Sequence, residues 1–263
     1  MTDGDGAEFR WIEGGDGEPI VLLHGLLGDL YHWEASVEAL APACRPIALA
    51  LPVFDPRLMA PTVAELGRHV VRFLDALDIA RVVMGGNSLG GHVALHVALT
   101  YPGRVAGLIL TGSSGLFERS TGGRAPHHPS LQYVRAKMEE VVYDASLVTP
   151  AWVEAVRGLV TQRFTALRVV RFAQAAKRNN LEQRLAEIRV PALIVWGTED
   201  RITPIDVGER FHALIAGSQF WTLTNCGHAP MLEHPHAFNA IVREWLHETR
   251  SRRAQFMTAG AAR

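Results

Sequence analysis

The chain has 263 residues, of which 48% are hydrophobic and 20% charged, so it can bury a large core without disulfides or a structural metal. Its 26 Lys and Arg residues balance 27 Asp and Glu residues, and this near-neutral charge argues against nucleic-acid binding. Two cysteines are too few for a disulfide framework. No apolar run approaches the roughly 18 residues that cross a bilayer, and the acidic N-terminus lacks a signal-peptide pattern. We therefore expect a cytoplasmic protein without a membrane or nucleic-acid partner.

Short, wholly apolar runs recur in the first and last parts of the chain, as in strands that are buried on both faces of a parallel sheet. Helical patterns lie between many of them, and Thr62 and Glu65 form a capping box at the start of one. This alternation predicts an α/β fold with a mostly parallel central sheet flanked by helices. The predicted strands cover residues 20–23, 47–51, 81–84, 105–110, 193–196 and 220–223.

The alternation stops between Gly112 and Arg189. Residues 113–129 are rich in Gly, Ser, Pro and His, which is typical of a loop, and this loop is a candidate hinge. Residues 130–188 show helical patterns only. We interpret 113–189 as a helical cap that is inserted into a core domain of residues 1–112 and 190–248. Residues 249–263 lack apolar periodicity and are predicted to be a flexible tail.

Residues 86–91 read Gly-Asn-Ser-Leu-Gly-Gly and lie between a predicted strand and a predicted helix. In this context Gly-x-Ser-x-Gly predicts a nucleophile elbow, a turn so tight that glycines are needed two positions on either side of Ser88. The helix that follows would direct its positive N-terminal end at a developing oxyanion. An ordinary glycine turn with a capping serine is the alternative, and a phosphate-binding loop fits the glycine spacing less well.

A serine nucleophile needs a base, and that base needs an acid to orient it. Asp200 and His228 both follow late predicted strands, so they should lie at the same sheet edge as Ser88. Glu199 competes with Asp200 for the role of the acid. We expect Ser88 to attack, His228 to transfer its proton and Asp200 to hold the imidazole.

Two backbone N–H groups should bind the oxyanion. One belongs to Leu89, directly after the nucleophile. The other is expected on the glycine-flanked loop after the first strand, where Leu26 is the candidate and the assignment carries an uncertainty of one position.

Four segments carry a resemblance to the α/β-hydrolase fold superfamily: residues 24–28 (His-Gly-Leu-Leu-Gly), 86–91, 196–200 (Trp-Gly-Thr-Glu-Asp) and 227–228 (Gly-His). They occur in the family's order within residues 8–247, and the cap falls where the family inserts one. The resemblance implies a serine hydrolase that acts on a small molecule and uses neither a metal nor an organic cofactor. Our first expectation is cleavage of a carboxylic ester of a small hydrophobic substrate through an acyl-enzyme.

The elbow is also similar to that of the carbon–carbon hydrolases that cleave meta-ring-fission products, with Asn87 as the point of similarity. Carbon–carbon cleavage is therefore the alternative, although that group often has Trp where this chain has Ala229. A non-catalytic small-molecule receptor is a third possibility, which the complete triad disfavours. The sequence carries no signal for an oligomeric state.

Several other residues have two readings. Arg168, Arg171 and Arg178 are expected to form a solvated basic face rather than a carboxylate site. His127 and His128 lack acidic or Cys ligands nearby, so no metal site is predicted there. Cys226 is near His228 in sequence and is expected to be a small buried residue.

Overall fold

The computed structural model describes residues 1–4, 6–58, 60–117 and 129–261. Within these residues seven strands form one sheet with the order β1-β3-β2-β4-β5-β6-β7. Every neighbouring pair is parallel except β1 and β3. The strands are β1 (Trp11–Glu13), β2 (Pro19–Leu23), β3 (Arg45–Leu49), β4 (Val82–Asn87), β5 (Val105–Thr111), β6 (Ala192–Gly197) and β7 (Gln219–Leu223). The predicted α/β fold with a mostly parallel sheet is thus confirmed.

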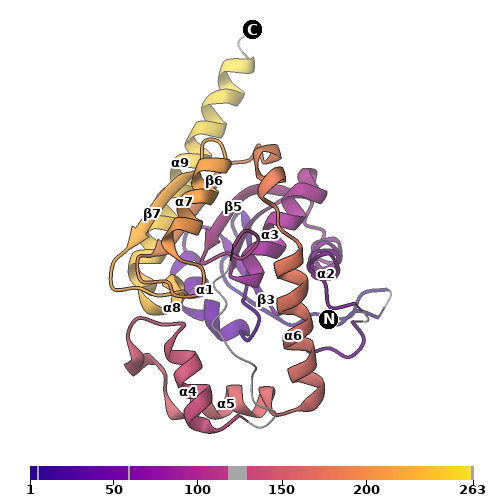
Figure 1. Cartoon of the computed structure of the whole chain (residues 1–263). Coiled ribbons are helices and arrows are strands. Elements are labelled where there is room, and N and C mark those ends of the chain that lie inside the picture. The colour runs from indigo at the N-terminus through magenta and orange to yellow at the C-terminus, as the bar shows by residue number, and fades with distance from the viewer. Residues whose placement is uncertain (5, 59, 118–128, 262–263) are drawn as a thin grey trace.

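Helices cover both faces of the sheet (Figure 1). One face packs against α2 (Val63–Ala76), α3 (Leu89–Thr100) and α7 (Ile205–Leu214), and the other against α1 (Glu34–Leu40) and α9 (Pro235–Ala261). Strands β4, β5 and β6 are buried throughout, because helices cover them on both sides. At the start of α2 the Thr62 hydroxyl accepts a hydrogen bond from the Glu65 N–H at 3.2 Å, as the capping box predicts.

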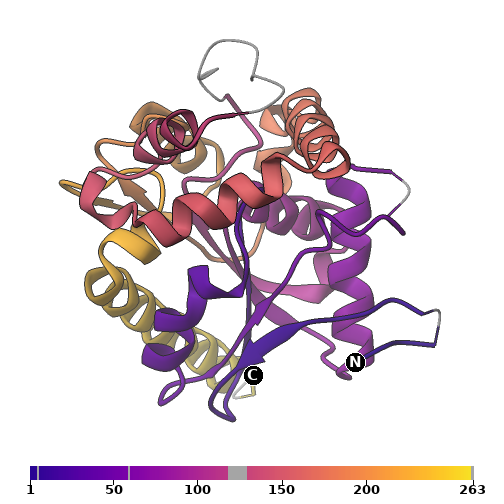
Figure 2. The same cartoon turned by 90° about the horizontal axis from the view of Figure 1, so that it is seen from below.

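Among the described residues between β5 and β6, the secondary-structure elements are all helices. They are α4 (Leu131–Glu139), η3 (Ala145–Leu147), α5 (Pro150–Val160), α6 (Arg163–Arg178) and η4 (Glu182–Glu187). Helices α4 and α5 lie below the sheet in Figure 1, and in Figure 2 they lie in front of it. Their apolar faces form a small cluster of their own around Val134, Met138 and Val153. Residues 118–128 of the predicted hinge loop lie outside the described residues.

The structure departs from the sequence-based expectations at both ends of the chain. The short antiparallel strand β1 carries no buried apolar run, so the sequence did not indicate it. Helix α9 continues to Ala261, whereas a flexible tail without apolar periodicity was expected from Thr249. Arg250 donates to Glu18 at 2.9 Å and to the Ala43 carbonyl at 2.8 Å, and these contacts join the start of this extension to the core.

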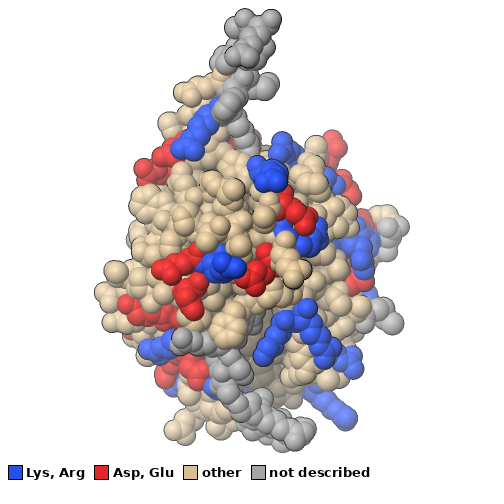
Figure 3. All heavy atoms as spheres, turned by 45° about the horizontal axis from the view of Figure 1, so that its top comes forward, with Lys and Arg blue, Asp and Glu red and all other residues tan. Residues whose placement is uncertain are grey.

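The remaining short elements are η1 (Leu30–Trp33), η2 (Pro102–Arg104) and α8 (Pro230–Glu233). Acidic and basic side chains are interspersed over the face drawn in Figure 3, in keeping with the net charge of -1. No helix among the described residues is long and apolar enough to cross a membrane.

Candidate active site

Ser88 occupies the turn between β4 and α3 with φ 55° and ψ -120°. A positive φ is uncommon for a residue other than glycine and costs free energy, so the surrounding packing has to impose it. The flanking glycines make this possible. A Cβ on Gly86 would lie 2.3 Å from the Gly90 carbonyl carbon, and one on Gly90 would lie 2.1 Å from the Leu23 carbonyl oxygen. The structure therefore has the strained strand-turn-helix geometry that the sequence predicts.

Asp200 and His228, which follow β6 and β7, meet at this edge of the sheet. The Nδ1 atom of His228 lies 2.8 Å from Asp200 Oδ2, and both side chains are buried. Because the carboxylate only accepts, the hydrogen of the neutral imidazole is on Nδ1 and the lone pair is on Nε2. Glu199, the competing acid, instead accepts from Thr198 Oγ1 at 2.6 Å and from the Cys226 N–H at 2.9 Å.

Thr203 supports the Asp200 carboxylate and was not identified from the sequence. Its hydroxyl donates to Asp200 Oδ2 at 2.9 Å and lies 3.2 Å from His228 Nδ1, while its N–H donates to Asp200 Oδ1 at 2.9 Å. The Ile202 N–H also donates to Oδ1, at 2.8 Å. The carboxylate is thus held by three donors in addition to the imidazole. The Thr-Pro pair at 203–204 was visible in the sequence, but only the fold shows where the hydroxyl points.

Asn87, which precedes the nucleophile, joins three strand ends. Its side-chain amide donates to the Thr111 carbonyl at 3.1 Å and to the His228 carbonyl at 2.9 Å, so it ties the loop of the imidazole to β4 and β5. The backbone N–H of Ser88 also donates to the Thr111 carbonyl, at 3.2 Å. These bonds tie the backbones of Ser88 and His228 to the same edge of the sheet, although the two residues are far apart in the sequence.

The loop after β2 faces the elbow. A Cβ on Gly25 would lie 3.3 Å from Ser88 Cβ. Among the described residues the N–H groups of Leu26 and Leu89 have no hydrogen-bond acceptor, which fits a pair of donors that could bind a substrate oxygen. His24 fixes this loop: its Nδ1 bonds the Gly25 carbonyl at 2.7 Å and its Nε2 accepts the Leu51 N–H at 2.9 Å. Burial lowers the pKa of His24, which favours the neutral ring that these two bonds require.

Glu233 clamps the loop that carries His228. Its carboxylate accepts the N–H groups of Gly227 at 2.9 Å and Ala229 at 3.1 Å, on either side of the histidine. It also accepts the N–H of Tyr143 at 2.7 Å, and the His228 N–H donates to the Val141 carbonyl at 2.8 Å. The imidazole loop is therefore anchored directly to the cap.

The predicted solvated face of basic residues is wrong for Arg168. This side chain is 5% exposed and donates to the carbonyls of Val53 at 2.7 Å and Leu58 at 3.0 Å, so it fastens α6 to the loop between β3 and α2. Its guanidinium also lies over the rings of Phe164 and Phe172. Arg171 and Arg178 are exposed, as expected.

Cys226 and the adjacent histidines His127 and His128 are the remaining residues that the sequence singled out. Cys226 is buried, and burial raises the pKa of its thiol, so it is an unreactive packing residue. His127 and His128 lie outside the described residues. No cluster of His, Cys, Asp or Glu suited to a metal occurs in the described part of the chain.

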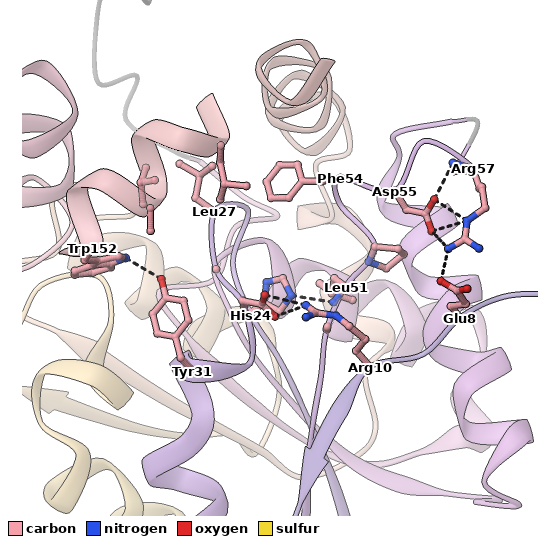
Figure 4. A pocket seen from close by; sticks show the side chains of 17 residues that line it. Glu8, Arg10, His24, Leu27, Tyr31, Leu51, Phe54, Asp55, Arg57 and Trp152 are labelled. Carbon is pink, nitrogen blue, oxygen red and sulfur yellow. Dashed lines mark hydrogen bonds and ion pairs between the residues drawn. The ribbon is translucent and has the colours of Figure 1, made fainter. Parts of the chain in front are cut away.

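A cavity of about 410 Å³ lies between the loop after β2, the loop after β3 and helix α5 of the cap (Figure 4). Leu27 and Phe54 line it from the core, and Val156 and Leu159 line it from the cap. At one end the Trp152 indole N–H donates to the Tyr31 hydroxyl at 2.8 Å. Its size suits a small organic ligand.

Comparisons with known proteins agree with this architecture. A profile of the alpha/beta hydrolase family matches residues 20–241. The 2-hydroxy-6-oxononadienedioate/2-hydroxy-6-oxononatrienedioate hydrolase of Cupriavidus pinatubonensis is 33% identical over 94% of this chain and 93% of its own, and the enzyme of that name from Paraburkholderia xenovorans is 31% identical over the same shares. Among solved structures, a meta-cleavage product hydrolase from Pseudomonas fluorescens has a TM-score of 0.81 at 25% identity and covers 91% of this chain and 94% of its own. The chain belongs to the alpha/beta hydrolase family.

Proposed function

We propose that the protein is a carbon–carbon bond hydrolase that acts on a 2-hydroxy-6-oxo-dienoate of the meta-cleavage type. The observation that carries this proposal is the identity of 31–33% with hydrolases of 2-hydroxy-6-oxononadienedioate over nearly the whole of both chains. The sequence alone placed ester cleavage first. These relatives move carbon–carbon cleavage ahead of it.

Ser88 is the proposed nucleophile, and His228 is its base. His228 takes the Ser88 proton as Oγ attacks the C6 ketone, and Asp200 stabilises the imidazolium that forms. The backbone N–H groups of Leu26 and Leu89 bind the oxygen of the tetrahedral adduct. The support for these roles is the positive φ of Ser88, the 2.8 Å contact between His228 and Asp200, and the N–H groups of Leu26 and Leu89, which have no acceptor among the described residues.

A carbon leaving group must leave with its electron pair stabilised. Transfer of the 2-hydroxyl proton to C5 gives a 2-ketone that is conjugated with the C3–C4 double bond. When the C5–C6 bond breaks, the released pair spreads onto the C2 oxygen, which takes up a proton to give 2-hydroxypenta-2,4-dienoate. Water then hydrolyses the acyl group on Ser88, so the net reaction consumes one water and releases the acyl arm as a carboxylic acid.

Ester hydrolysis by the same residues is the second candidate, because an ester needs no such preparation of its leaving group. Ala229 favours it, since this small residue follows His228 where carbon–carbon hydrolases often carry Trp. One structural neighbour at 25% identity, with a TM-score of 0.77, is described as an N-acyl homoserine lactone degrading enzyme, whose substrate also contains an ester bond.

The two candidates are separated by substrates that share one acyl group. We would compare kcat/KM for a 2-hydroxy-6-oxo-dienoate and for the p-nitrophenyl ester of the carboxylic acid that this dienoate releases on cleavage. Carbon–carbon hydrolysis predicts a kcat/KM for the dienoate at least a hundredfold above that for the ester. Efficient ester turnover with no loss of the dienoate absorbance would reject the proposal and leave an esterase.

A further inference from the structure

The cavity beside α5 is only a short distance along the loop from the proposed reacting centre. A Cβ on Gly25 would lie 3.3 Å from Ser88 Cβ, whereas Leu27 and Gly28 line the cavity. A carbonyl bound at the Leu26 N–H would therefore have one of its two substituents next to the cavity. The acyl arm is the substituent that stays on Ser88 after the first chemical step.

The middle of the cavity is apolar. Leu27, Phe54, Val156 and Leu159 come from three separate segments of core and cap, and Figure 4 shows Leu27 and Phe54 near each other beneath the cap helices. An alkyl or aryl group placed among them would lose contact with water, which is favourable in proportion to its area. The volume of about 410 Å³ leaves room for a chain of several carbons.

The charged groups that line the cavity are already paired with one another. Arg10 Nη2 lies 2.8 Å from each carboxylate oxygen of Asp29. Arg57 is held by Asp55, at distances from 2.7 to 3.1 Å, and by Glu8 at 2.9 Å. The lining thus contains three carboxylates and two guanidinium groups, so its formal charge is -1 when His24 is neutral.

A substrate carboxylate would meet a lining of net negative charge in which each arginine already has a carboxylate partner. It would have to share Arg10 with Asp29, or Arg57 with Asp55 and Glu8, and it would add a further negative charge beside them. The indole N–H of Trp152 is also engaged, by the Tyr31 hydroxyl. A neutral apolar arm meets none of these costs.

We propose that this cavity holds the acyl arm of the substrate and selects a neutral, apolar arm over one that ends in a carboxylate. The inference rests on the proposed attack at a carbonyl, but it does not depend on whether the bond cleaved is carbon–carbon or ester. It distinguishes this chain from enzymes whose substrates carry a second carboxylate on the acyl arm.

The test uses pairs of substrates in which an isopropyl group replaces a carboxylate of the same shape. One pair is p-nitrophenyl 6-methylheptanoate and p-nitrophenyl hemiadipate, whose carboxylate is too distant to attack its own ester readily. The other pair is the two dienoates with the same acyl arms. We expect kcat/KM to be at least tenfold higher for the neutral member of each pair, after correction for alkaline hydrolysis rates.

Two variants connect this preference to the cavity. Asp29→Asn keeps an acceptor for the Leu30 N–H and releases Arg10, so the preference for the neutral arm should fall at least fivefold. Asp75→Asn is the matched control, because Asp75 pairs with Arg104 at 2.7 Å outside the cavity lining, and it should keep the wild-type ratio. Leu159→Trp fills the cavity and should lower the ratio of heptanoate to acetate ester turnover at least tenfold, with Leu159→Phe as a milder substitution should the tryptophan impair folding.

Equal or better turnover of the carboxylate arms would overturn the inference, as would an unchanged chain-length ratio in folded Leu159→Trp and Leu159→Phe proteins. A neutral-arm preference among esters, with neither dienoate cleaved, would support the cavity assignment and reject carbon–carbon hydrolysis. Cleavage of both dienoates at equal rates would support carbon–carbon hydrolysis and reject the cavity assignment.

Discussion

Thr203→Val removes one hydroxyl from the centre of the proposed acid–base pair and keeps the shape of the side chain. Thr203 is 0% exposed, so water cannot replace the hydrogen bond that its hydroxyl donates to Asp200 Oδ2 at 2.9 Å. A hydrogen bond to a charged group contributes about 1.5–3 kcal/mol. We therefore expect the free energy of unfolding to fall by about 2 kcal/mol, measured by urea denaturation with an unchanged m-value. We also expect kcat/KM to fall about tenfold, because Asp200 holds the imidazole less firmly.

Thr203→Ser restores the hydroxyl and should recover most of both losses. Thr161→Val is the control for removing a threonine hydroxyl elsewhere, since Thr161 Oγ1 donates to the Arg157 carbonyl at 2.8 Å within the cap. It should leave the wild-type kcat/KM within about twofold. Wild-type stability and activity in Thr203→Val would refute the reasoning. An equal loss in Thr203→Ser would show that side-chain shape matters here and the hydroxyl does not.

Three further predictions concern folding, the elbow and the cap. Burial lowers the pKa of His69 to about 4 from 6.5, so the unfolded chain binds the proton first and the free energy of unfolding falls as the pH falls from 6.5 toward 4. His69→Leu removes this group, so the decrease in the free energy of unfolding between pH 7 and 5, measured by urea denaturation, should be about 2 kcal/mol smaller than in wild type. Gly90→Ala places a methyl group against the Leu23 carbonyl and should either prevent folding or lower kcat/KM at least a hundredfold, whereas a folded, fully active protein would contradict the tight elbow. Arg168→Met removes the bonds to the loop after β3 and should raise hydrogen exchange there and in α6; unchanged protection would reject the fastening role.

The parts of the fold that the sequence predicts well are those set by local pattern. Continuous apolar runs identify β2, β4, β5 and β6 because these strands are buried on both faces. The elbow is similarly local, since the spacing of Gly86, Ser88 and Gly90 follows from the steric limits of one turn. The mostly parallel sheet also follows from the alternation of strands and helices along the chain.

The parts that the sequence does not predict depend on contacts between distant segments. Nothing near Arg168 in the sequence indicates that it reaches the carbonyls of Val53 and Leu58, so a basic helix face was the natural expectation. Glu233 likewise gains its role only when Gly227, Ala229 and Tyr143 come together. Helix α9 extends past its apolar part, and there Arg250 contacts Glu18 from the other end of the chain.

The choice between two acids shows where sequence and structure complement each other. Glu199 and Asp200 are adjacent charged turn residues, and the sequence favours Asp200 only by its position at the end of the loop. The structure separates them, because Glu199 accepts the Cys226 N–H while Asp200 meets His228. Local propensity in a loop does not encode which of two adjacent side chains points toward a residue that is distant in the sequence.

The cleavage of a 2-hydroxy-6-oxo-dienoate by wild type and by Ser88→Ala tests the central claim most directly. The loss of dienoate absorbance should be rapid in wild type and at least about a thousandfold slower in the variant, with unchanged circular dichroism, because the triad acts as a unit. A folded Ser88→Ala protein that cleaves the dienoate within tenfold of the wild-type rate would contradict the account of Ser88 as the nucleophile.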